Sequence, residues 1–108
     1  MSALKVTNLL INATADETAG AVTPLNGSSR FNLSVRWGLG TSAGAVMVET
    51  APYKDYAGTW VPQTTFTWSA AGKIDEWRGT GPFGAVRARI ETAITTSNEG
   101  VWADLSEN

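Results

Sequence analysis

The chain has 108 residues, ten acidic and eight basic side chains, a formal net charge of −2, and neither cysteine nor histidine. This length is typical of one domain, so residues 1–108 are expected to form a single domain. Without cysteine and histidine there is no disulfide framework, no thiolate metal site and no usual general base. The composition therefore predicts a protein that is not an enzyme and holds neither cofactor nor metal.

The charge pattern and the apolar runs predict neither a nucleic-acid partner nor a membrane partner. The basic residues are spread along the chain, whereas binding to nucleic acid needs a clustered basic face. No apolar run approaches the roughly 20 residues of a membrane span. The N-terminal Met1–Lys5 lacks the basic and then apolar order of a signal peptide.

Short alternating segments between regularly spaced turn residues predict an all-β chain. A first strand is expected over Leu4–Ile11, followed by a helical turn over Thr14–Ala19. The clearest alternation lies at Arg30–Trp37, where every second residue is apolar and should face inward. Further strands are expected at Ala45–Thr50, Thr64–Trp68, Lys73–Trp77, Ala85–Ile94 and Val101–Leu105.

Alternation in several strands indicates sheets with one dry and one wet face, as in antiparallel packing. About seven or eight strands predict an antiparallel β-sandwich, either immunoglobulin-like or a jelly roll. Val46, Val48, Val86 and Ile90 should face the core. The outward row Arg87, Arg89 and Glu91 could face a partner, but charged rows usually face water.

Three groups of residues invite a chemical interpretation, and each has a plainer one. Asp75 and Glu76 are adjacent in a strand, so they should face opposite sides and not act as a catalytic pair. Asp16, Glu17 and Asp55 lack the spacing of a calcium loop. The glycine-rich stretch Gly79–Gly84 precedes a strand rather than a helix, so it predicts a strand connection, not a phosphate loop.

Aromatic residues supply the candidates for an interface. The chain has five tryptophans; Trp37 and Trp68 lie in register with apolar neighbours and should be core. The others fall in loop-like or out-of-phase positions, where exposed rings could contact a partner or a sugar. Two tyrosines lie in an exposed-looking loop, and the apolar N-terminal segment 1–11 could add a strand to a neighbouring subunit. The interface candidates are Trp60, Trp77, Trp102, Tyr53, Tyr56, Leu4 and Val6.

Two groups of residues resemble a motif of small β-sandwich virion proteins of tailed bacteriophages. The first is Val46-Met47-Val48-Glu49-Thr50-Ala51-Pro52, with Gly58-Thr59-Trp60 after a polar loop. The second is Phe66-Thr67 with Gly81-Pro82-Phe83-Gly84-Ala85-Val86-Arg87-Ala88-Arg89-Ile90. The resemblance covers roughly residues 44–105. The family's usual Asp-Gly turn after the proline is replaced here by Tyr53–Gly58.

This resemblance implies a structural protein of the phage particle. The first expectation is a capsid decoration (cement) protein, a homo-oligomer such as a trimer, bound to the major capsid protein or other virion proteins. It would assemble in the host cytoplasm and reside in the virion. The alternatives are a neck, tail or fibre component, or a carbohydrate- or host-surface-binding module.

Overall fold

The strands of the protein follow the alternation of apolar and polar residues along the chain. The computed structural model describes residues 5–14, 23–24, 30–53, 55–80 and 84–107. Within these residues there is no helix, and there are eight strands. They are β1 (Lys5–Ala13), β2 (Thr23–Pro24), β3 (Arg30–Trp37), β4 (Thr41–Ala51), β5 (Val61–Thr67), β6 (Ile74–Thr80), β7 (Ala85–Thr96) and β8 (Val101–Glu107).

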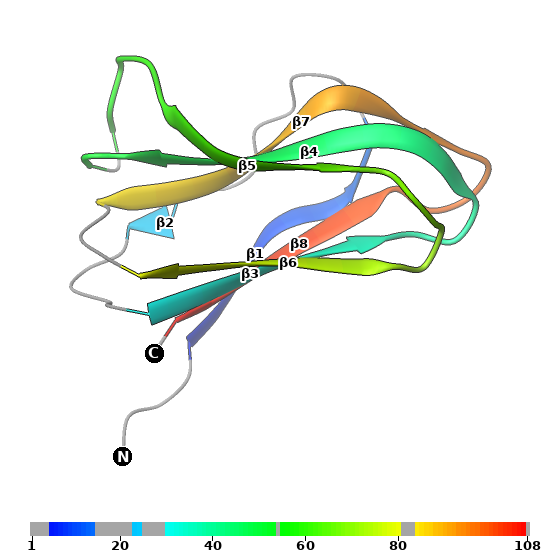
Figure 1. The fold of residues 1–108 in the computed structure, drawn as a ribbon, viewed down its shortest axis with the longest axis horizontal. Coiled ribbons are helices and arrows are strands. Elements are labelled where there is room, and N and C mark those ends of the chain that lie inside the picture. The colour runs from blue at the N-terminus through cyan, green and yellow to red at the C-terminus, as the bar shows by residue number, and fades with distance from the viewer. Residues whose placement is uncertain (1–4, 15–22, 25–29, 54, 81–83, 108) are drawn as a thin grey trace.

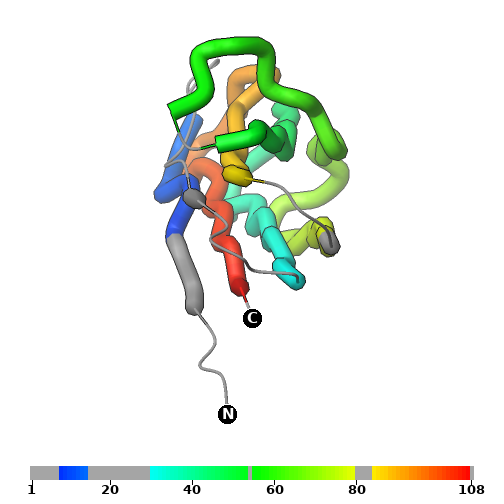
Figure 2. The backbone as a smooth tube through the Cα atoms, turned by 90° about the vertical axis from the view of Figure 1, so that its left-hand side faces the viewer, coloured from blue at the N-terminus to red at the C-terminus, as the bar shows by residue number. Residues whose placement is uncertain are grey.

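The strands form two antiparallel sheets that lie one above the other (Figure 1). One sheet has the order β1-β8-β3-β6 and is called here the 1-8-3-6 sheet; the other has the order β2-β7-β4-β5 and is called the 2-7-4-5 sheet. Seen from the side, the chain between β4 and β5 arches over the top of the 2-7-4-5 sheet (Figure 2). The outer face of the 1-8-3-6 sheet has no comparable cover among the described residues.

The order of strand pairing identifies the topology. Strand β1 pairs with β8, β2 with β7, β3 with β6 and β4 with β5, all antiparallel. Such nested pairing is a long hairpin folded over into two sheets, which is the eight-stranded jelly roll. An immunoglobulin sheet instead combines the first, second, fifth and fourth strands. The sandwich predicted from the sequence is therefore confirmed, and of its two forms the jelly roll is present.

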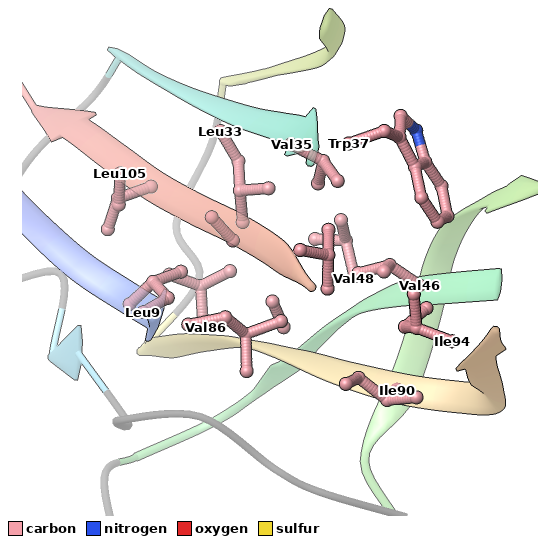
Figure 3. Packing of buried hydrophobic residues seen from close by; sticks show 14 of the residues in the cluster. Leu9, Leu33, Val35, Trp37, Val46, Val48, Val86, Ile90, Ile94 and Leu105 are labelled. Carbon is pink, nitrogen blue, oxygen red and sulfur yellow. The ribbon is translucent and has the colours of Figure 1, made fainter. Parts of the chain in front are cut away.

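The core lies between the two sheets and is built from the inward residues of β3, β4, β7 and β8 (Figure 3). Leu33, Val35 and Trp37 of β3 are fully buried. They face Val46 and Val48 of β4 across the sandwich. Each such side chain contributes roughly 1.5–3 kcal/mol through removal of apolar surface from water. The inward pattern predicted for these strands is confirmed.

The predicted segments differ from the strands mainly at their ends. The strand Arg30–Trp37 is confirmed at both ends, whereas β1 (Lys5–Ala13) ends later than the predicted Ile11. Strands β4 and β7 are longer than predicted, because polar residues continue the pairing beyond the apolar core. Strand β2 was not predicted, since two residues that include a proline carry no alternation. Residues 15–19 of the predicted helical turn lie outside the described residues.

Candidate interaction site

Several of the residues that carry the resemblance meet on the outer face of the 2-7-4-5 sheet, whereas others belong to the core. Strands β4 and β7 pair directly, with Glu49 opposite Arg87 and Met47 opposite Arg89. Because Val46 and Val48 point into the core, their neighbours Met47 and Glu49 must point outward. The outward residues of β4 and β7, together with Trp60 from the loop before β5, are called here the outer-face cluster. Its members are Met47, Glu49, Ala51, Trp60, Ala85, Arg87 and Arg89.

A buried carboxylate lies at the centre of the outer-face cluster. The Oε1 atom of Glu49 accepts hydrogen bonds from Nε of Arg87 at 2.9 Å and from Nε of Arg89 at 3.1 Å. Glu49 is only 5% exposed, and the two arginine side chains are 23% and 19% exposed. A carboxylate this far from water is tolerated because it is paired and hydrogen-bonded. The carboxylate thereby ties two neighbouring residues of β7 to β4.

Trp60 anchors the β4–β5 loop to the outer-face cluster. The guanidinium carbon of Arg87 lies 4.3 Å from the Trp60 ring centroid, a cation–π contact. The ring also packs on Ala51 and Ala85, with Tyr56 beside them. The indole nitrogen donates to the carbonyl of Tyr56 at 3.3 Å. Since Trp60 is only 7% exposed, it holds the loop down and presents no free ring.

The backbone of Gly84, just before β7, lies in close contact with the backbone at the start of this loop. Its amide donates to the carbonyl of Ala51 at 3.0 Å. A Cβ atom at position 84 would lie 1.7 Å from the Pro52 carbonyl oxygen, which no side chain can occupy. The glycine is therefore required by close backbone approach. Gly81–Phe83 of the same stretch lie outside the described residues.

The loop presents one tyrosine to solvent. Tyr53 is 57% exposed, whereas Tyr56 is half-buried. The two rings meet edge to face, with their centroids 5.3 Å apart. Val61, at the far end of the loop, is 55% exposed and pairs with Thr50. The loop thus offers a small exposed apolar surface that is anchored from below by the outer-face cluster.

The remaining interface candidates lie elsewhere in the fold. Trp77 is half-buried and packs on Phe31 at 5.3 Å between ring centroids, on the core side of its sheet. Trp102 is half-buried on the outer face of the 1-8-3-6 sheet, beneath the Arg36 guanidinium at 5.1 Å. Val6 lies in β1, which pairs with β8 of the same chain. Leu4 lies outside the described residues.

The two residues of the acidic pair in β6 lie on opposite faces of the strand, as their spacing predicted. Asp75 accepts a hydrogen bond from the Trp37 indole nitrogen at 2.9 Å and lies 3.3 Å from Nζ of Lys73. Glu76 is exposed and lies 3.6 Å from Arg78. Across the described residues no three acidic side chains gather as a metal site would require, and no helix there could span a membrane. Asp16 and Glu17 lie outside this part of the chain.

The sequence did not indicate the buried ion cluster. Glu91 is exposed as predicted, but Arg87 and Arg89 are largely covered and bind Glu49 instead of water. Alternation in β4 was enough to predict that Glu49 points outward, because its neighbour Val48 points into the core. It does not identify the residue on β7 that lies opposite Glu49. The register that puts Arg87 opposite Glu49 is a long-range feature that no local pattern contains.

The chain matches no protein-family model, no curated protein and no solved structure.

Proposed function

We propose that the protein is a non-enzymatic structural protein of a tailed-bacteriophage virion that decorates the outside of the capsid. The observation that carries the proposal is the convergence of several motif residues in the outer-face cluster and beside it. Glu49, Trp60, Gly84 and Arg87 are separated by up to 38 positions, yet they meet around one loop. The resemblance thus rests on residues that cooperate in three dimensions.

The chemistry of the cluster favours a structural role over catalysis. Its carboxylate is closed off by two arginines and by the loop above it, so substrate has no access to Glu49. What reaches solvent is the loop surface around Tyr53. A loop anchored through Trp60 that carries an exposed tyrosine suits protein contact, because a tyrosine offers contact area at a low cost in conformational entropy. The partner in this proposal is the major capsid protein or another virion protein.

The topology is compatible with this role and does not select it alone. Jelly rolls occur in viral capsid proteins and in lectins, and one fold hosts many functions. A sugar-binding module would use exposed aromatic rings for stacking. Among the described aromatic residues Tyr53 alone is exposed, and none of the five tryptophans is. This favours a protein partner over a sugar.

Binding to particles tests the proposal. Purified chain would be mixed with particles of its phage that lack it, and the bound fraction measured by co-sedimentation. Saturable binding at hundreds of copies per particle, counted by quantitative mass spectrometry against the major capsid protein, is the expected result. A handful of copies would assign the protein to the neck, tail or a fibre. No binding to any particle would refute a virion role.

A further inference from the structure

We infer that the outer face of the 1-8-3-6 sheet is a self-association surface that binds the same face of a second copy. This face has no cover among the described residues, unlike the outer face of the 2-7-4-5 sheet. Its residues lie in rows across the strands. One row holds Ile74, Arg36 and Trp102, and the next holds Glu76, Ser34 and Asp104. The inference goes beyond the proposed function and does not depend on it.

The first row combines exposed apolar surface with a positive charge. Ile74 is 55% exposed, and Ile11, in β1 at the level of Trp102, is 63% exposed. Arg36 lies over the Trp102 ring. Beneath it the indole nitrogen of Trp102 is buried without a hydrogen-bond partner among the described residues. An unpaired buried donor is costly, but this one is covered by its own chain and forms no part of the exposed surface.

The two rows carry opposite charges. Glu76 lies near Arg78 of its own strand, whereas Arg36 and Asp104 form no ion pair among the described residues. Both Arg36 and Asp104 are exposed. They lie one row apart, since Arg36 is opposite Trp102 while Asp104 is opposite Ser34. The first row therefore presents the cation of Arg36. The second presents the carboxylates of Glu76 and Asp104.

A two-fold axis between the two rows brings the positive charge of one copy against the negative charges of the other. Such an axis, in the plane of the interface and perpendicular to the strands, places the first row of each copy on the second row of the other. Arg36 then lies between the Glu76 and Asp104 carboxylates of the partner copy, and Trp102 lies opposite Asp104 of that copy. Each contact occurs twice, as an isologous interface requires. Like charges of these two rows do not face each other, which supports this register.

The size of the face predicts a weak dimer. Four strands spaced about 4.8 Å apart and a few rows of side chains cover only several hundred Å² per copy. Stable interfaces bury roughly 800 Å² per partner. Dissociation constants on the order of 10–100 µM are therefore expected. Because two charge pairs contribute, salt should weaken the dimer.

The test is sedimentation equilibrium of the full chain over a concentration series up to about 1 mM. As the concentration rises, the average molecular mass of the native protein should shift from that of one chain toward that of two. Arg36→Glu and Asp104→Arg should each raise the dissociation constant at least about tenfold, because each places like charges together. The double variant R36E/D104R restores opposite charges between positions 36 and 104 but leaves Glu76 beside position 36, so it should bind at least about threefold more tightly than either single variant without reaching native affinity. Arg30→Glu makes the same charge change on the same strand and face, three rows away, and should have no effect.

Folding and contact are checked separately. The charge variants alter exposed side chains, so their circular dichroism should match the native chain, and the melting temperature of Arg36→Glu, which loses the contact with Trp102, should fall by no more than about 8 °C. In ¹H–¹⁵N spectra the Trp102 indole signal, assigned with Trp102→Phe, should move with concentration, and the fully buried Trp37 signal should not. A native chain that stays monomeric at about 1 mM would overturn the inference. So would a dimer unchanged by Arg36→Glu, or a double variant that binds no more tightly than the single variants.

Discussion

The buried carboxylate of Glu49 provides the sharpest test of how the β4–β5 loop is held. Glu49→Gln keeps the size of the side chain and removes its charge. The amide oxygen can still accept one hydrogen bond, but Arg87 and Arg89 lose their counter-ion. Both arginines are about one-fifth exposed, so water can solvate them only in part.

The expected loss follows from this partial burial. Removing one partner of a fully buried ion pair costs about 3–5 kcal/mol. The partial exposure of the arginines reduces this, so a loss of about 2–4 kcal/mol is expected. At about 4–8 °C per kcal/mol for a domain of this size, the melting temperature should fall by roughly 10–30 °C.

Thermal and urea unfolding, followed by tryptophan fluorescence and circular dichroism, would measure the loss. Glu76→Gln is the matched control, because Glu76 pairs with Arg78 at 3.6 Å on the exposed surface; it should change stability by less than about 0.5 kcal/mol. The triple variant E49M/R87M/R89M removes all three charges and should be more stable than Glu49→Gln alone. If Glu49→Gln lay within about 0.5 kcal/mol of native, the cluster would not hold the loop as inferred.

Three further substitutions probe the core, the loop anchor and the backbone contact. Leu33→Ala, at a fully buried position of β3, should cost about 2–5 kcal/mol in urea unfolding; a loss under 1 kcal/mol would mean that the core is not packed as described. Trp60→Ala should cost about 3–5 kcal/mol and make residues 52–60 the first site of limited proteolysis; unchanged cleavage would refute the anchoring role. Gly84→Ala puts a Cβ against the Pro52 carbonyl and should lower the melting temperature strongly; a native-like melt would contradict that close approach.

Residue spacing in the sequence was sufficient for the fold class and for most of the core. Arg30–Trp37 shows why: apolar residues at every second position can be buried together only in an extended strand. The same reasoning placed Asp75 and Glu76 on opposite faces, where they have separate partners. These features depend on neighbours along the chain, so local patterns contain them.

Long-range pairing decided what the sequence could not. The choice between an immunoglobulin-like sandwich and a jelly roll depends on β1 finding β8 and β2 finding β7 at the two ends of the chain. Glu49 is buried only because register sets Arg87 opposite it and the loop brings Trp60 over that arginine. Likewise, Arg36 and Asp104 become a complementary pattern only once β3 and β8 lie side by side. Alternation specifies which side chains enter the core between the sheets, whereas the partners of the outward side chains are set by tertiary contacts between distant segments.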